Sequence, residues 1–301
     1  MTAPDQSRPI VGILWMLVTG LCFVVVTGVV RHLGTGLPAA QSAFIRFLYG
    51  IVFLAPTLLP ALKRGISPQV WKLALGRGVL HVMAVILWFF AMARIPVAEV
   101  TAIGYLNPIV VTVGAALFLG ERLAFRRLAA IAIALVGAII ILRPGFREVM
   151  PGHLGQLGAA ICFGLSYLIA KRMSVLVAPG AIIALLSLMV TIGLAPLALA
   201  VWVPPTLEQV GWLGVVAAFA TIGHYTMARA FVAAPLTVTQ PVTFLQLVWA
   251  TLLGWLVFDE AVDPLVLVGG GIIIAAISYM TWREAQIKRR VVTPPPVAVK
   301  L

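Results

Sequence analysis

Two stretches of equal length decide the fold of this chain, because the second repeats the pattern of the first. They read PVAEVTAIGYLNPIVVTVGAALFLGE over residues 96–121 and PLTVTQPVTFLQLVWATLLGWLVFDE over residues 235–260. Each begins with a proline, continues as an apolar run and ends on a glutamate, and a constant shift of 139 positions relates them. An internal repeat indicates the architecture before any single residue is interpreted. The sequence therefore predicts two related halves.

A second match supports the repeat. Residues 20–23, Gly-Leu-Cys-Phe, match residues 160–163, Ala-Ile-Cys-Phe. Each half holds five apolar spans, and an odd number of crossings makes the second half insert in the opposite direction. We expect the cysteines of this match, Cys22 and Cys162, to behave as small apolar residues rather than as a disulfide or a metal site.

The composition excludes a soluble globular domain. Of the 301 residues, 62% are hydrophobic and 10% are charged, and the mean hydropathy is +1.11. A transmembrane helix needs about 20 apolar residues, and no span has the alternating pattern of a membrane barrel. The prediction is an all-α polytopic membrane protein with ten transmembrane helices. The expected spans are 10–31, 38–60, 71–93, 97–119, 125–143, 153–172, 179–202, 210–232, 236–258 and 264–283.

The net charge of +12 could indicate a nucleic-acid partner, so the positions of Lys and Arg have to decide. Most of them fall in connections on the side of the N-terminus, whereas Arg31, Arg94, Arg143 and Arg147 fall on the opposite side. Short loops rich in Lys and Arg stay in the cytoplasm. We therefore predict cytoplasmic termini and no nucleic-acid partner. The expected organisation is a cytoplasmic N-terminus (1–9), a first five-helix repeat (10–148), a second, inverted repeat (149–284) and a disordered cytoplasmic tail (285–301).

Three short motifs carry a resemblance to a known family. They are Phe-Ile-Arg-Phe at 44–47, Leu-Asn-Pro at 106–108 and Leu-Gly-Glu-Arg at 119–122. With them the chain resembles the ten-helix EamA-type members of the drug/metabolite transporter superfamily, over residues 10–284, and within it the YddG-like exporters of amino acids. The second half departs from the family pattern, with Leu247 where proline often stands and Phe-Asp-Glu at 258–260. The resemblance implies a bacterial inner-membrane protein with a central cavity lined by spans 1, 3, 4, 6, 8 and 9, and with spans 5 and 10 outside it.

Polar and aromatic side chains on the spans expected to line this cavity are the candidate binding residues. In the third span, Arg77, His81, Trp88 and Met92 follow helical spacing and share one face. Pro108 is expected to kink the fourth span, where the amide of Asn107 matches that of Gln246 in the ninth. The predicted cavity residues are His81, Trp88, Thr101, Tyr105, Asn107, Tyr167, His224, Tyr225, Gln240, Thr243, Gln246 and Trp249, with Pro108 and Gly104 as a hinge.

The charged residues near the spans are expected to have structural roles. Glu99 lies in the first turn of its helix, where a carboxylate faces the positive end of the helix dipole. Arg46 is expected to snorkel or to bond to carbonyl groups at a helix end, with contact to the substrate as the alternative. Glu121 and Glu260 close equivalent hairpins and are expected to secure loops, and Asp263 caps the helix that begins at Pro264.

The function predicted from these features is a secondary transporter that exports aromatic or other neutral amino acids and related small metabolites by alternating access. Efflux of drugs or lipophilic cations, or carriage of another small metabolite, is an alternative. A phosphosugar carrier would need clustered Lys and Arg in the cavity, and a cation pump an intramembrane acid, and the sequence indicates neither. An intramembrane enzyme using His81 and His224 lacks an accompanying catalytic motif. No catalytic residue, metal or cofactor is predicted, and the oligomeric state stays open, a monomer included.

Overall fold

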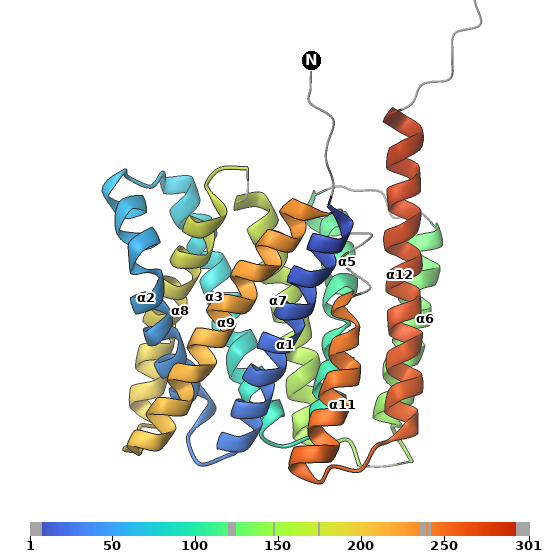
Figure 1. Cartoon of the computed structure of the whole chain (residues 1–301), viewed down its shortest axis with the longest axis horizontal. Helices are drawn as coiled ribbons and strands as arrows, with labels where there is room; N and C mark the ends of the chain where they lie inside the picture. The colour runs from blue at the N-terminus through green and yellow to red at the C-terminus, as the bar shows by residue number, and fades with distance from the viewer. Residues whose placement is uncertain are drawn as a thin grey trace, which may run out of the picture.

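The computed structural model describes residues 8–119, 125–146, 148–173, 175–234, 239 and 242–292, and their elements are helices (Figure 1). Ten apolar helical segments follow one another, eight long enough to cross a membrane, with α4 and α5 counted as one, and two shorter ones, α6 and α11. The predicted ten-helix membrane fold is therefore confirmed. The helices are α1 (Pro9–Leu33), α2 (Ala39–Lys63), α3 (Pro68–Met92), α4 (Val97–Gly104), α5 (Asn107–Leu119), α6 (Phe125–Leu142), α7 (Pro151–Met173), α8 (Pro179–Ala200), α9 (Leu207–Ala233), α11 (Leu245–Phe258) and α12 (Pro264–Val292).

The helix packing follows the inverted repeat. The repeat relates α1 to α7 and α3 to α9. The contact between α1 and α9 therefore corresponds to the contact between α7 and α3, and these two contacts are the most extensive in the bundle. The next two, α6 with α12 and α2 with α8, each join a helix to its own repeat partner. The halves are therefore interleaved rather than side by side. Because ten crossings bring the chain back to its starting side, α1 begins and α12 ends at the same end of the bundle (Figure 1).

The predicted fourth span is broken rather than continuous. Helix α4 ends at Gly104 and α5 begins at Asn107, with Tyr105 and Leu106 between them. Pro108 has no backbone N–H to donate to the Gly104 carbonyl, and its ring clashes with that carbonyl. The amides of Tyr105 and Leu106 instead bond three residues back, to Ala102 and Ile103, at 3.2 and 3.0 Å. The predicted kink is thus a break between two helices.

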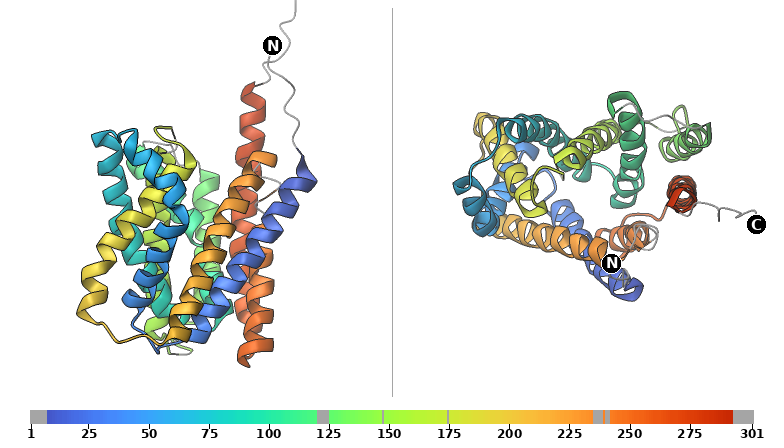
Figure 2. Two further views of the ribbon diagram at one scale, coloured as in Figure 1. Left: turned by 60° about the vertical axis from the view of Figure 1, so that its left-hand side comes forward. Right: turned by 90° about the horizontal axis from the view of Figure 1, so that it is seen from above.

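Helices α6 and α12 stand together at one edge of the bundle (Figures 1 and 2). They cross at a pair of glycines. A Cβ on Gly137 would lie 2.6 Å from the carbonyl oxygen of Gly269, and a Cβ on Gly269 would lie 2.6 Å from the carbonyl oxygen of Gly137. Small residues at a membrane crossing let two backbones approach closely, and van der Waals packing then holds the helices together.

Gly137→Ala should lower the stability of the protein by about 1–3 kcal/mol, because the new methyl group overpacks the crossing against rigid backbone. Thermal unfolding in detergent measures the loss. Gly271→Ala is the matched control on α12, since nothing lies within 4 Å of its Cβ position. Equal melting temperatures for the two variants would contradict a close crossing at Gly137.

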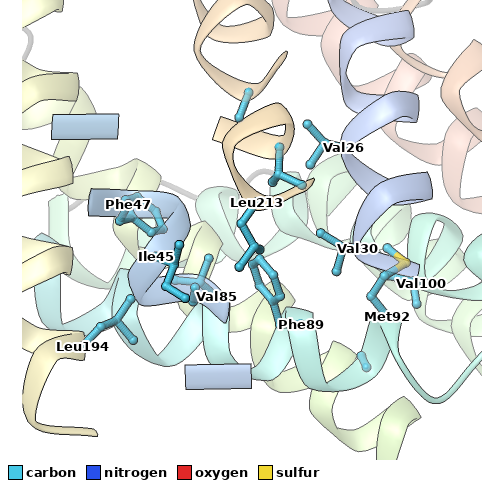
Figure 3. Packing of buried hydrophobic residues seen from close by; sticks show 14 of the residues in the cluster. Val26, Val30, Ile45, Phe47, Val85, Phe89, Met92, Val100, Leu194 and Leu213 are labelled. Atoms are coloured by element: carbon cyan, nitrogen blue, oxygen red, sulfur yellow. The ribbon is translucent and has the colours of Figure 1, made fainter. Parts of the chain in front are cut away.

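A buried apolar cluster joins α1, α2, α3, α8 and α9 beside the centre of the molecule (Figure 3). Val26 and Val30 come from α1, Phe47 from α2, and Val85 and Phe89 from α3. This cluster fixes the relative position of helices from both halves. Val26, Val85 and Phe89 of this cluster also form part of the wall of the central cavity.

Candidate central cavity

A cavity of about 470 Å³ lies between the two halves. This volume falls within the range of about 300–1,000 Å³ that small-molecule sites occupy. Its walls come from α1, α3, α4, α5, α7, α9 and α11, together with Arg46 of α2 and two residues of α8. Among the residues found to line it, none comes from α6 or α12. The cavity thus has the position that the resemblance implied, with α2 and α8 as additional walls.

The polar face of α3 turns into this cavity. Arg77, His81, Trp88 and Met92 all line it. Arg77 and Trp88 are eleven residues apart on one helix, which at about 1.5 Å per residue separates them by about 16 Å along the axis. The α3 face therefore extends along the length of an elongated site.

Aromatic rings form the wall around His81. Its imidazole meets the rings of Phe47 and Phe163 edge-on, at centroid distances of 5.9 and 5.0 Å, and Phe163 stacks on Tyr167 at 6.2 Å. The His81 Nδ1 lies 3.1 Å from the hydroxyl of Ser166, so the ring is held by a hydrogen bond between α3 and α7. His224, on α9, also lines the cavity and meets the ring of Phe23 at 5.3 Å. The two predicted histidines are therefore both brought to this site.

Amide side chains gather in the same cavity. Asn107 and its repeat partner Gln246 both line it, and Gln156 of α7 joins them. The Oδ1 of Asn107 and the Oε1 of Gln156 are buried without a hydrogen-bond partner among the described residues. Gly104 allows this arrangement, because a Cβ there would lie 3.3 Å from the Gln156 amide nitrogen. Two unused acceptors thus belong to side chains of the cavity wall.

Two arginines line the cavity as well, which corrects the expectation that it holds no cluster of cations. Arg46 turns inward from α2 with its guanidinium 4.0 Å from the Phe47 ring centroid, instead of snorkelling to a membrane surface. Arg77 is 6% exposed, and its Nη1 donates to the Ile182 carbonyl at 3.1 Å. Sequence spacing could not reveal the pair, because the two residues come from different helices. The only indication in the sequence was that each of these charged residues lies inside an apolar span.

The remaining predicted residues divide into cavity and non-cavity positions. Thr101, Tyr105 and Tyr167 line the cavity together with Gly104. Tyr225 does not, and it is 58% exposed, because consecutive helical residues point about 100° apart and His224 already occupies the inner face. Thr243, Trp249 and the hinge residue Pro108 are not among the lining residues, and Gln240 lies outside the described residues.

Sequence reasoning missed two polar residues of the cavity wall, Thr27 and Gln156, and Gln156 is the more polar of the two. It sits one turn inside α7 and is 2% exposed. The position related to it by the first-half match, Met16, is apolar, so the repeat gave no indication of an amide. An amide in an otherwise apolar span was the only signal.

An ion pair between the two halves lies at the end of the bundle where α3 meets α4. The Arg31 Nη2 is 2.7 Å from Oε1 of Glu260, and its Nη1 donates to the Met92 carbonyl at 3.1 Å. The other oxygen of Glu260 accepts the backbone N–H of Val97 at 2.9 Å. One carboxylate thus ties α1 and α4 to the segment after α11. The equivalent Glu121 lies outside the described residues.

Glu99 and His153 form a second, more deeply buried pair near the same end. The Nε2 of His153 lies 2.6 Å from Oε2 of Glu99, and both side chains are at most 5% exposed. The Nδ1 of His153 accepts the backbone N–H of Met150 at 3.0 Å, so Nε2 carries the proton and donates to the carboxylate. The pair joins the first turns of α4 and α7. Glu99 therefore does more than face a helix dipole, since it also connects two helices.

Asp263 caps α12 as expected. Its carboxylate accepts the Leu265 N–H at 2.9 Å and pairs with Arg143. Partial burial raises the pKa of this carboxyl group, but the bonds from Leu265 and Arg143 outweigh burial and the net pKa is lowered. The cap is thus ionised at neutral pH, and its stabilising contribution is lost only as the pH falls through this lowered value.

The sequence matches the model of one protein family in two separate ranges. The model of the EamA-like transporter family covers residues 10–143 and 150–282. The chain belongs to this family.

Named relatives of this transporter span nearly its whole length. A riboflavin transporter of Rhizobium johnstonii is 31% identical and covers 96% of each chain, and a riboflavin transporter of Vibrio cholerae is 29% identical, over 95% of this chain and 97% of its own. An S-adenosylmethionine uptake transporter of Rickettsia bellii is 25% identical, over 91% of this chain and 94% of its own. One crystal structure aligns with a TM-score of 0.58 at 19% identity, over 92% of this chain and 98% of its own, and supports the fold. The chain is thus a multi-pass membrane transporter of small molecules.

Proposed function

We propose that this transporter moves a small metabolite with a planar ring system through the central cavity by alternating access, and that riboflavin is the first substrate to test. The observation that carries the proposal is the aromatic wall that Trp88, Tyr105, Phe163 and Tyr167 form in the central cavity. Flat ring systems stack on such side chains. The amides of Asn107, Gln156 and Gln246 offer both donors and acceptors to polar groups on a ring.

Relatives support riboflavin rather than amino acids as the leading candidate. Two chains of about 30% identity over nearly the full length are named riboflavin transporters. Export of aromatic amino acids, which the sequence motifs favoured, is the second candidate, because Arg77 and Arg46 in the cavity could pair with a carboxylate. A position in the bacterial inner membrane with cytoplasmic termini belongs to the same proposal and rests on the distribution of Lys and Arg.

The two half-bundles supply the moving parts in this proposal. The break between α4 and α5 and the repeat-related start of α11 face one another, with the ring of Tyr105 5.4 Å from that of Phe244. The Tyr105 hydroxyl donates weakly to the carbonyl of Phe244 at 3.3 Å. Rocking of one half against the other about such a junction would open the cavity to each side in turn, with Gly104 and Pro108 as the hinge.

Counterflow in liposomes tests the substrate class. Purified protein is reconstituted with internal unlabelled riboflavin, and entry of labelled riboflavin is measured with tryptophan, phenylalanine, alanine or glucose 6-phosphate as external competitors. We expect riboflavin to enter, and tryptophan and phenylalanine to compete while alanine and glucose 6-phosphate do not. The proposal fails if no ring compound enters faster than into protein-free liposomes, or if alanine competes as well as tryptophan.

Trp88→Ala should raise the KM for the ring substrate about two- to tenfold, because a stacked aromatic pair is worth about 0.5–1.5 kcal/mol. Trp88→Phe should recover most of the affinity. The matched control is Trp255→Ala on α11, a side chain that is 54% exposed and does not line the cavity. Initial rates over a range of substrate concentrations separate KM from the maximal rate. A KM that is unchanged in Trp88→Ala would remove this ring from the site.

A further inference from the structure

The cavity is electrostatically unbalanced. Arg46 and Arg77 both line it, whereas none of the residues found to line it is Asp or Glu. Burying cations in a membrane protein is costly unless a counter-charge or a ring of acceptors compensates them. The described residues of the cavity wall provide little counter-charge and no ring of acceptors around these two cations.

Arg77 retains unused hydrogen-bonding capacity. Its side chain is 6% exposed, and one N–H, on Nη1, reaches the Ile182 carbonyl. Its Nε is buried without any partner among the described residues. The bond to Ile182 explains how Arg77 helps to hold α3 against α8, but it accounts for only one of the five N–H groups of a guanidinium. The other N–H groups of the Arg77 guanidinium therefore remain available to a planar anion.

Arg46 lies against an aromatic face and not against an acid. Its guanidinium is over the ring of Phe47, and among the described residues it has neither an ion pair nor a hydrogen-bond partner. Both arginines interact electrostatically with Tyr167, His81 and His224. All five side chains line the same cavity, and we call the part of its wall that they form the cationic region, because it contains the two cations Arg46 and Arg77.

The neighbouring wall is complementary to this region. Phe163 and Tyr167 form stacked rings beside it, and the unused acceptor atoms of Asn107 and Gln156 belong to the same cavity. On α7, Gln156 and Tyr167 are eleven residues apart, which is about 16 Å along a helix. A ligand with an anionic group at one end, a ring in the middle and an N–H donor at the other end would satisfy all three features.

We propose that the cationic region binds an anionic group of the substrate, a carboxylate or a phosphate, through the guanidinium groups of Arg46 and Arg77. The inference rests on the proposed transport of ring-containing metabolites and adds that an anionic one is preferred over a neutral one such as riboflavin. Guanidinium groups bind carboxylate and phosphate by paired N–H···O bonds that lysine cannot reproduce. The transporter therefore distinguishes an acid from its neutral analogue of the same shape.

Isosteric substrate pairs test this inference in liposomes. Indole-3-acetate and indole-3-acetamide differ in charge but hardly in shape, and riboflavin 5′-phosphate against riboflavin examines phosphate separately from carboxylate. We expect the wild-type protein to prefer one acid over its neutral partner by at least about tenfold, which corresponds to about 1.4 kcal/mol. Arg77→Gln and Arg46→Gln should each reduce that ratio to near one, because the preference for the acid is lost. Which acid shows the preference identifies carboxylate or phosphate.

Arg94→Gln is the matched control, because Arg94 also lies over a ring, that of Phe90, but is outside the cavity. Its acid-to-neutral ratio should equal that of the wild type. Thermal unfolding in detergent, with and without indole-3-acetate or riboflavin 5′-phosphate, provides a second readout. The preferred acid should stabilise the wild type but not Arg77→Gln or Arg46→Gln.

Equal handling of acid and neutral partners by the wild-type protein overturns the anion site while leaving ring transport intact. If no ring compound crosses the membrane, the proposed function fails instead. In that case the anion site is decided by the unfolding measurement alone. Stabilisation by an acid that is lost in both arginine variants supports it, and no stabilisation overturns it.

Discussion

His153→Leu should lower the stability of the folded protein by about 3 kcal/mol or more, because it removes the buried donor of a hydrogen bond to a charged acceptor. The variant leaves the Glu99 carboxylate buried without the donor that now lies 2.6 Å from it. It also removes the acceptor for the Met150 N–H at the start of α7. Thermal unfolding in detergent should show the largest decrease in melting temperature among the variants described above.

The double variant Glu99→Met with His153→Leu separates charge burial from packing. Replacing both members of a buried pair by apolar side chains of similar size is often neutral or stabilising, so the double variant should recover most of the loss. A double variant as unstable as His153→Leu would mean that the loss comes from packing or helix capping and not from the missing donor to the Glu99 carboxylate.

Glu260→Gln should slow transport by about tenfold, the factor that corresponds to about 1.4 kcal/mol of lost bias between conformations. The substitution removes the ion pair with Arg31, which joins the two halves, but keeps a side-chain oxygen for the Val97 N–H. In an alternating-access cycle, this end of the cavity would close less completely without the pair. Counterflow rates measure the effect, and the melting temperature should change little.

Site-directed labelling distinguishes a gate from a general loss of activity. In a background in which Cys22 and Cys162 are replaced by alanine, Thr101→Cys places a thiol on the cavity wall at a half-buried position. A membrane-impermeant maleimide should label it faster in Glu260→Gln than with glutamate at this position. The matched control is Glu208→Gln on α9, whose carboxylate accepts a hydrogen bond from the nearby Trp212, and this variant should leave labelling unchanged. Identical labelling rates would contradict a closing role for the Arg31–Glu260 pair.

Much of the architecture was predictable because it depends on patterns within one segment. Apolar length predicts a transmembrane helix, and helical periodicity alone placed Arg77, His81, Trp88 and Met92 on a common face, which the structure finds in the cavity. The same periodicity should have separated His224 from Tyr225, since neighbours in sequence cannot share one helix face.

The site could be predicted only in part, because its chemistry arises where helices meet. The break after Gly104 follows from Pro108, but no spacing rule relates Arg46 to Arg77 or Glu99 to His153. For such residues the sequence indicated that a charge lay within or beside an apolar span, and the choice between snorkelling, pairing and lining a cavity depended on the neighbouring helix.

By itself, the sequence determined ten spans, two related halves and their opposite insertion, because hydrophobic length and repeat number act on each segment separately. Only the tertiary structure decided that the halves interleave, with α1 on α9 and α3 on α7, and which side chains those contacts bring together. The electropositive, aromatic cavity is a result of that packing. Side chains from several helices create it jointly, and no single helix contains the information for it.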